Sequence, residues 1–501
     1  MATYDVPQEG LRKDIPLASE EYVVKAMPPI LNTHDMTSVY LVAIFFIING
    51  VSAAGGGAAG FTYWIICGLT FFVPCAIATA QLGVMFPHEG SLYNWTHKAL
   101  GGYWSFFIGF CAWFPGVLVI ISGADGVVSC IQALNGNWLS PAYQQGLVII
   151  GIILLSGIVS LQRFRTVQNI VNVVIILIFL AVALIGISGA LWLLKGHASA
   201  TSFKNFTDWA ISWNPKNTNI GLFGTITLAY LGTEVPLNMG GEIMGRKVVT
   251  RHLLWGTLLV FVGYFVTTFS LAVVQGPAAI ASSSNPVSVL IGTVDTNLGK
   301  FAGSITALCI TAFFVTVPIV YNYAFARLLL VAGIDKRLPP SVGKLNKNRV
   351  PSTAIIFQTV VTGLLTAIIF FVVPYVARIG RPEDLANEVY FVVQAATTLV
   401  WAVSCIFFFV NLAIFFTRDR RTFHLHRIFP TPVLVISIII GPIACVFAIV
   451  DTLFNSWISG LIPNANWWYI VGGLTLFCLI VAAIGSMLAS SEADWQNSSS
   501  Q

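Results

Sequence analysis

The chain has 501 residues, of which 56% are hydrophobic and only 9% are Asp, Glu, Lys or Arg. Soluble domains carry roughly 25% charged residues, so this composition excludes an ordinary water-soluble protein and favours one that is surrounded by a lipid bilayer. The formal net charge is +5, but the positive residues lie in short clusters between apolar runs, which gives no indication of a nucleic-acid partner.

Residues 1–35 are polar and of mixed charge, so we expect a cytoplasmic N-terminal segment and no cleavable signal peptide. A membrane-spanning helix needs about 20 apolar residues. Such runs fall at 36–54, 61–86, 102–132, 145–161, 167–194, 218–241, 252–275, 301–333, 352–373, 388–417, 431–454 and 467–488. The predicted fold is therefore an all-α integral membrane protein with twelve transmembrane helices and a polar tail over 489–501.

Twelve spans place both termini on the same side of the membrane. Of the 25 Lys and Arg residues, 19 fall on the side of the termini and six on the other side. Cytoplasmic loops of membrane proteins carry an excess of Lys and Arg. We therefore predict a cell-membrane protein with both termini in the cytoplasm and an extracellular loop over 195–217.

Two of the predicted spans contain segments that are poor helix formers. The first span leads into Asn49 to Gly60, which has five glycines in twelve residues, and each Gly costs about 1 kcal/mol relative to Ala in a helix. The sixth span contains Tyr230-Leu231-Gly232-Thr233-Glu234-Val235-Pro236, where the proline removes a backbone donor. Irregular backbone at membrane depth persists only where protein or a water-filled cavity satisfies it. We expect both helices to be interrupted.

Interruptions in spans one and six occupy equivalent positions in two five-helix halves, residues 36–194 and 218–417, which two further spans over 418–488 follow. That pattern indicates an inverted-repeat transporter with a site near the middle of the membrane. Open helix ends offer N–H groups to a carboxylate and carbonyls to an ammonium. The candidate substrate-binding residues are Asn49, Gly50, Val51, Ser52, Ala53, Ala54, Gly55, Gly56, Tyr230, Leu231, Gly232, Thr233 and Glu234. Alternatively, the glycines only allow close helix packing or form the turn into span two.

Two acids in or near span six are candidates for proton transfer or gating. A carboxylate at the centre of a membrane helix costs about 2.5–3.5 kcal/mol, so Glu234 is interpreted as a ligand for a substrate ammonium or as a proton carrier. The alternative is a structural carboxylate that hydrogen-bonds the opened backbone of span one. Glu242 lies close in sequence to Arg246 and Lys247, which favours a gate or an interfacial ion pair over substrate binding.

Several stretches resemble the amino acid–polyamine–organocation (APC) superfamily of transporters. AQLGVMFP, EGSLYNW and ALG within residues 80–101 are similar to the family's AELG, P, GG-x-Y and LG segment, with Gln81 for the usual Glu and Ser91 for the second Gly. Asn322 to Arg327, with Leu338-Pro339 and Val350-Pro351, is similar to its N-S-R, LP and VP stretch. The spacing of Glu234 and Glu242, and the F-x-P of span two, look closest to the glutamate/GABA antiporter branch.

The resemblance implies a five-plus-five inverted-repeat fold in which spans one and six hold the substrate. Gly50 to Gly56 would meet its carboxylate, and Leu231 to Glu234 its amino group and side chain. Span five has no lysine between Thr166 and Leu194, where proton-coupled relatives have one, so exchange is favoured over symport. The long C-terminal plug of the glutamate/GABA antiporter is not found after Leu488, and we do not expect acid gating.

The predicted function is that of a secondary active transporter, a permease or antiporter that moves amino acids or related amines by alternating access. A proton- or sodium-coupled symporter of amino acids or polyamines is the alternative, with Ser52, Thr311 and Thr316 as candidate sodium ligands. A channel is a different class, and the non-equivalent halves disfavour it. An enzyme is not expected, since His88-Glu89 lacks the second histidine of a zinc-protease motif, and neither a cofactor nor a resident metal is expected.

Overall fold

The computed structural model describes residues 17–213, 218–283, 285–376, 382–418, 420–458 and 462–498. These residues are organised into helices, and the only β-structure found among them is two isolated bridges. Within the described part of the chain, ten helices are long and apolar enough to cross a membrane, and one bent pair of helices could form an eleventh span. The chain is a multi-pass, all-helical membrane protein.

The ten long helices match ten of the twelve predicted spans, and the other two predicted spans are the interrupted ones. Two of the ten are composite, and two are parts of longer helices. The helices are α4 with α5 (Ala59–Cys67 and Val73–Met85, joined by a π-helical turn at Gly68–Phe72), α7 (Gly102–Leu134), α8 (Ala142–Ser160), α9 (Phe164–Leu194), α12 (Arg246–Val274), α15 (Lys300–Ile334), α16 with α17 (Ser352–Ala367 and Val373–Val376, joined by a π-helical turn at Ile368–Val372), α18 (Pro382–Arg418), α20 (Thr431–Phe454) and α21 (Asn464–Ser498).

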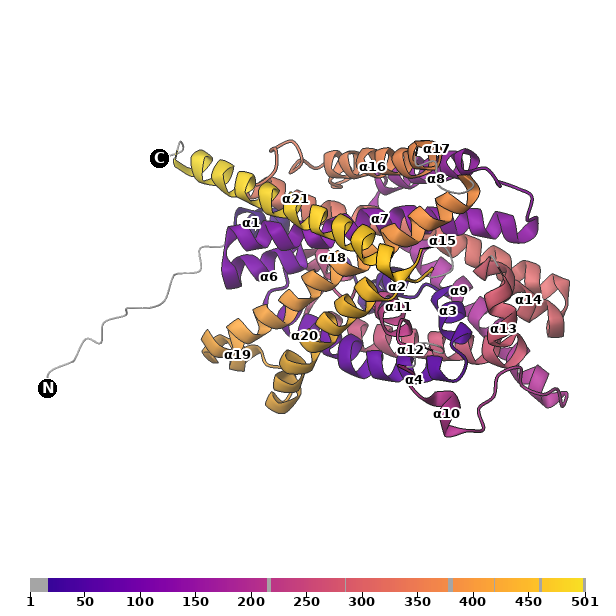
Figure 1. Ribbon diagram of the computed structural model, residues 1–501. Coiled ribbons are helices and arrows are strands. Elements are labelled where there is room, and N and C mark those ends of the chain that lie inside the picture. Colours follow the sequence, from indigo (N-terminus) through magenta and orange to yellow (C-terminus); the bar gives the residue numbers. More distant parts are fainter. Residues whose placement is uncertain are drawn as a thin grey trace, which may run out of the picture.

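Short helices mark the two ends of the bundle (Figure 1). One end carries α1 (Ala18–Ala26), α6 (Ser91–Leu100) and α19 (Arg420–His426), and the last turns of α21 reach the same end. The opposite end carries α10 (Phe206–Trp209), α13 (Gly276–Ser282) and α14 (Pro286–Leu298). We call these the α1 end and the α10 end.

Helices α7 and α15 pack closely side by side because α7 presents glycines where α15 presents aromatic rings. A Cβ atom at Gly116 would lie 2.4 Å from the Phe325 ring, and one at Gly126 would lie 2.4 Å from the Phe314 ring. Small residues are the usual means of close packing between membrane helices, because burial from lipid supplies little driving force. The α7–α15 pair forms a firm wall next to the interrupted helices.

The first interruption lies earlier in the chain than the glycine-rich segment predicted to form it. Helix α2 (Thr33–Ile44) is followed by α3 (Asn49–Gly55), and the pair is bent by 48° at residues 45–48. Gly50 is helical because α3 packs on α12, where a Cβ at Gly50 would lie 2.9 Å from Thr267 Cγ2. Tertiary packing therefore outweighs the poor helix propensity. The later glycines form the turn into α4, as the alternative interpretation of the glycine-rich segment predicts.

The second interruption lies where the sequence predicts it. Helix α11 (Leu222–Ala229) ends directly before Tyr230, and Gly232 has a φ of +108°, a conformation that glycine adopts without strain. Two 3₁₀ turns follow, at Val235–Asn238 and Gly240–Glu242. The predicted span over 218–241 is thus a short helix followed by irregular backbone.

Candidate substrate site

One tyrosine hydroxyl joins the two interruptions. Tyr264 of α12 lies 2.7 Å from the Ile44 carbonyl oxygen, where α2 ends, and 3.1 Å from that of Ala229, where α11 ends. The same oxygen accepts from the Phe46 backbone N–H at 3.1 Å and from Asn49 Nδ2 at 3.4 Å. Opened helices at membrane depth must find such partners, and Tyr264 supplies them to both helices at once.

A second tyrosine stabilises the end of α2. Tyr321 of α15 donates to the carbonyl oxygen of Ala43 at 2.7 Å. The backbone N–H groups of Ile47 and Ile48, within the first interruption, have no backbone acceptor in the described part of the chain. Tyrosine hydroxyls therefore bind the Ala43 and Ile44 carbonyls at the end of α2, while the Ile47 and Ile48 N–H groups of the bend have no backbone acceptor among the described residues.

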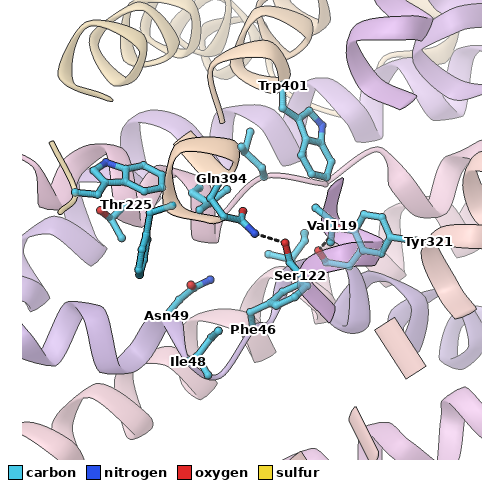
Figure 2. A pocket seen from close by; sticks show the side chains of 15 residues that line it. Phe46, Ile48, Asn49, Val119, Ser122, Thr225, Tyr321, Gln394 and Trp401 are labelled. Atoms are coloured by element: carbon cyan, nitrogen blue, oxygen red, sulfur yellow. Dashed lines mark hydrogen bonds between the residues drawn. The ribbon is translucent and has the colours of Figure 1, made fainter. Parts of the chain in front are cut away.

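A cavity of about 130 Å³ lies between the two interruptions (Figure 2). One water molecule takes up about 10–15 Å³ of such space, so the cavity has room for a small organic solute. Its lining comes from both interruptions and from α7, α15 and α18. The lining residues are Ala43, Ile44, Phe46, Ile48, Asn49, Val119, Ser122, Thr225, Leu228, Leu231, Tyr321, Phe391, Gln394, Trp401 and Trp457.

The polar groups in the wall are largely bound to other protein groups. Figure 2 shows the Gln394 amide pointing to the Ser122 hydroxyl, to which it donates. Ser122 in turn donates to the Leu118 carbonyl at 3.0 Å, and Thr225 donates to the Gly221 carbonyl at 3.2 Å. An exception is the indole N–H of Trp457, which is buried and has no partner among the described residues.

Glu234 lies next to the cavity but does not line it. Its side chain is buried, with 1% of the residue exposed, and Oε1 accepts a hydrogen bond from Trp401 Nε1 at 2.7 Å. Oε2 is buried without a hydrogen-bond partner among the described residues. The carboxylate is therefore held by an indole of α18 and not by the backbone of the first interruption.

Two of the other predicted substrate-binding residues, Asn49 and Leu231, line the cavity. Ser52 lines an adjoining hollow of about 280 Å³, and this hollow shares Thr225, Phe391 and Trp457 with the cavity. Because Ser52 is exposed, the shared lining leads from the cavity to the protein surface.

The remaining predicted residues make contacts away from the cavity. In α3, Gly50 packs on α12, Gly55 and Gly56 end the helix, and the side chains between them are buried at Val51, Ala53 and Ala54. In the second interruption, Tyr230 stacks on Phe72 with ring centroids 4.4 Å apart. The Thr233 hydroxyl lies 3.2 Å from that of Thr79. Of the candidate sodium ligands, Thr311 and Thr316 donate to carbonyls of their own helix at 2.8 Å.

A buried ion pair lies between the cavity and the α1 end and closes that side of the cavity. Glu242 pairs with Arg327 of α15, and both side chains are almost fully buried. Arg327 also donates to the Tyr323 carbonyl at 2.8 Å and lies 4.4 Å from the centre of the Phe164 ring. The sequence indicated a gate or an ion pair for Glu242, and the partner is this buried arginine.

Backbone contacts clamp the segment that carries Glu242. The Ile30 and Leu31 N–H groups donate to the Glu242 carbonyl at 2.9 Å, and the Met244 N–H donates to the Leu31 carbonyl at 3.0 Å. On the other side, the Gly90 N–H donates to the Asn238 carbonyl at 3.1 Å. The irregular half of the sixth predicted span is thus fixed on both sides at the α1 end.

A second buried acid, Glu89, touches the same segment. Its Oε2 accepts from the Gly241 N–H, and Oε1 is buried without a partner among the described residues. Burial raises the pKa of this carboxyl, the Glu242 charge raises it further, and Arg327 and the Gly241 N–H lower it. The balance is a raised pKa, so Glu89 favours the protonated form while this segment stays closed.

Helix α1 covers Glu89 and the polar groups around it. Glu20 of α1 pairs with Lys98 at 3.0 Å and accepts from Asn94 at 2.8 Å. Glu20, His88 and Glu89 also border a cavity of about 10 Å³, which is close to the space of one water molecule. The α1 end is therefore closed by a network of charged and polar groups.

Most of the cavity wall could not be identified from the sequence. Ser122, Tyr321, Gln394 and Trp401 lie in long, mostly apolar runs, and polar groups in such runs are a signal of an internal site. The sequence does not show which face of each helix turns inward, so that signal does not bring the residues together. In the structure, their contact with the two interruptions brings these residues together.

Comparison with known proteins gives a consistent result. A sequence model described as amino acid permease matches residues 35–484. The chain is 23% identical to the inner membrane transporter YjeM of Salmonella typhimurium, over 88% of this chain and 93% of that protein. It is 24% identical to the branched-chain amino acid permease BcaP of Lactococcus lactis, over 78% and 82%. It is 22% identical to the probable agmatine/putrescine antiporter AguD of Lactococcus lactis, over 50% and 54%.

Proposed function

The chain belongs to the amino acid permease family of the APC superfamily, and from this premise we propose that it is a secondary active transporter that carries an amino acid across the membrane by alternating access. The observation that carries the proposal is the cavity of about 130 Å³ between two interrupted helices. Cavities at such interruptions are where transporters of this architecture hold their solutes.

The local backbone supports an amino acid as the solute. The Ile48 N–H in the cavity wall and the adjacent Ile47 N–H would meet the substrate carboxylate, and the Ala43 and Ala229 carbonyls would meet its ammonium through the lone pair that the tyrosine hydroxyls leave free. The partial charges at helix ends favour this arrangement. The sequence predicts the carboxylate site at Gly50 to Gly56, and we propose it instead at the bend that precedes α3.

The contacts on the two sides of the cavity support alternating access. Toward the α10 end, the hollow that contains Ser52 leads to the surface. Toward the α1 end, the Glu242–Arg327 pair and the clamp by Ile30 and Leu31 keep the path closed. Opening the α1 end would require these contacts to break while the opposite side closes.

We propose that the two interrupted segments are themselves spans, so that twelve spans form a five-plus-five inverted repeat with two added helices. The placement of α1 and the last turns of α21 at one end supports an even number of crossings. By the excess of Lys and Arg on that side, the α1 end is cytoplasmic. The structure then corresponds to a form that is closed toward the cytoplasm.

Exchange is the proposed mode of transport. The absence of a lysine in α9 between Thr166 and Leu194 supports it, as does a relative named as an antiporter. The glutamate/GABA branch stays a prediction, since two of the relatives compared above are named for other solutes, namely branched-chain amino acids and agmatine or putrescine.

The test uses purified full-length protein in liposomes loaded with a mixture of unlabelled amino acids, with labelled amino acids outside. An exchanger gives saturable uptake that is stimulated by internal amino acid and is unaffected by dissipating sodium and proton gradients. Uptake that does not saturate and does not respond to internal solute would indicate a channel and contradict the proposal.

A further inference from the structure

The described part of the cavity wall presents no charged side chain. Among the described residues that line it, none is Asp, Glu, Lys, Arg or His. Much of the surface is instead formed by apolar side chains from five different elements of the fold, namely Phe46, Ile48, Val119, Leu228, Leu231 and Phe391. A solute in this space meets hydrocarbon and aromatic rings over most of its surface.

The polar side chains of the wall have little capacity left for a second charged group. The hydroxyl of Tyr321 donates to Ala43, and the indole N–H of Trp401 donates to Glu234. The Gln394 amide donates to Ser122. Two amides of the bend, at Ile47 and Ile48, have no backbone acceptor in the described residues, and they suit the carboxylate that every amino acid carries.

The nearest acid identified next to the cavity is screened from it. Glu234 is not among the lining residues, whereas Trp401, which binds its Oε1, is. A cationic side chain in the cavity could pair with Oε1 of Glu234 only if the indole moved and its hydrogen bond broke, and Oε2 is buried away from the cavity lining. In the structure, Trp401 therefore separates the carboxylate from the solute.

A charged side chain placed in this cavity would lose its hydration without gaining an opposite charge. Burying an unpaired charge is among the most costly events in protein energetics. The aromatic rings offer a cation only the weaker attraction of their faces. An apolar side chain, in contrast, gains from leaving water.

On the basis of the proposed function, we propose that the solute is an amino acid with an uncharged, apolar side chain, such as leucine or methionine. The cavity disfavours lysine, arginine, glutamate and diamines, because it offers the substrate's own ammonium and carboxylate their partners, while its described lining offers no opposite charge to a further charged group. Trp401 is the specificity-determining residue, since it binds Glu234, the carboxylate that the described residues place beside the cavity.

The first test measures exchange in liposomes loaded with leucine against labelled leucine, methionine, lysine, glutamate and putrescine. We expect leucine and methionine to exchange with a kcat/KM at least tenfold above that of each charged solute. If lysine or putrescine exchanges as well as leucine, the inference is wrong while the proposed function stands. If none of these solutes, nor any from an extended amino acid panel, shows exchange in liposomes loaded with the same solute, the proposed function itself fails.

The second test removes the cover over Glu234. Trp401→Leu should raise the kcat/KM for lysine relative to leucine by at least tenfold, because the freed carboxylate then faces the cavity. The double variant Trp401→Leu/Glu234→Gln should lose that gain. The matched control is Trp468→Leu, at an exposed tryptophan of α21, which should keep the wild-type selectivity.

A gain for lysine that persists in the double variant, or no gain in a folded Trp401→Leu protein, would contradict the assigned role of Trp401. Folding is checked by the elution volume and melting temperature of each variant in detergent. If Trp401→Leu does not fold, the wild-type panel alone decides the substrate class.

Discussion

At the scale of single residues, Glu234 and Trp401 form one unit in the wall beside the cavity. Their hydrogen bond, 2.7 Å long, joins the second interruption to α18 across 167 positions of sequence. An acid within an apolar run identifies Glu234 from the sequence, because its burial requires a partner. The partner could not be predicted, because indole N–H groups of many tryptophans satisfy the same requirement.

Replacing the Glu234 carboxylate tests this unit. Glu234→Leu removes the acceptor and leaves the Trp401 N–H buried without a partner, which costs about 1–3 kcal/mol. We expect the KM for leucine exchange to rise by roughly tenfold. Glu234→Gln keeps an oxygen that can accept, so it should restore most of the loss. Equal defects in the two variants would show that the hydrogen bond does not position Trp401.

Glu89 should make the stability of the protein depend on pH. Because burial raises its pKa, the folded protein keeps a proton that the unfolded chain has already released above about pH 4–5. The free energy of unfolding therefore falls as the pH rises from that range toward the raised pKa. Glu89→Gln removes this proton equilibrium, so its melting temperature should fall less than that of the wild type between about pH 5 and about pH 8.

The control for this effect is Glu21→Gln, which changes an exposed acid of α1. It should retain the wild-type dependence of melting temperature on pH, and the surrounding groups Glu20, His88, Glu242 and Arg327 are unchanged in both variants. Parallel pH profiles for wild type and Glu89→Gln would mean that Glu89 is not the group that titrates.

At the scale of elements, Tyr264 links α12 to both interrupted helices. Tyr264→Phe leaves the Ala229 carbonyl without this donor, at a cost of about 1–3 kcal/mol for a buried unsatisfied group, while the Ile44 carbonyl and the Phe46 N–H keep only the 3.0 Å hydrogen bond between them. We expect a lower melting temperature and a loss of most exchange activity. The matched control is Tyr40→Phe, which removes a partly buried α2–α12 hydrogen bond to Thr257 that touches neither interruption.

The prediction for Tyr264 concerns the difference between these two tyrosine variants. Both lose one buried hydroxyl between the same two helices, so a general loss of packing would affect them alike. If Tyr40→Phe impairs exchange as much as Tyr264→Phe, the hydroxyl of Tyr264 has no special role in holding the interruptions.

The long helices could be predicted from the sequence because apolar length alone determines them, and α20 occupies the predicted residues 431–454. The second interruption could also be predicted, since Gly232 and Pro236 both disfavour a regular helix. The sequence also predicts an interruption of the first span but places it too late in the chain, because the bend lies at residues 45–48 and Gly50 stays helical through its fit against Thr267. That contact joins residues far apart in sequence, and composition does not reveal it.

At the scale of the whole molecule, the proposed orientation can be measured by labelling. All eight natural cysteines are buried, so single cysteines introduced at exposed positions should dominate the reaction with a membrane-impermeant maleimide. In intact cells, Lys204→Cys beside α10 should react, whereas Lys247→Cys at the start of α12 should react only after the membrane is permeabilised. The reverse pattern would invert the assigned orientation.

The sequence predicts a substrate site at the two interruptions, but it identifies only some of the residues that line the cavity. Asn49 and Leu231 belong to the segments expected to bind the substrate, and both line the cavity. The rest of the wall comes from α7, α15 and α18, which reach the interruptions only through the three-dimensional arrangement of the bundle. A residue such as Gln394 carries the right chemistry in the sequence, but its inward direction depends on packing.

The central claim is that the space between the two interrupted helices binds the solute. The most direct measurement is an electron cryomicroscopy structure of the full-length protein in lipid nanodiscs with saturating leucine. We predict density for one amino acid in contact with Asn49, Leu231 and Trp401, with its carboxylate toward Ile47 and Ile48. Spans one and six running as continuous helices with no cavity between them, or leucine bound only elsewhere, would contradict the account.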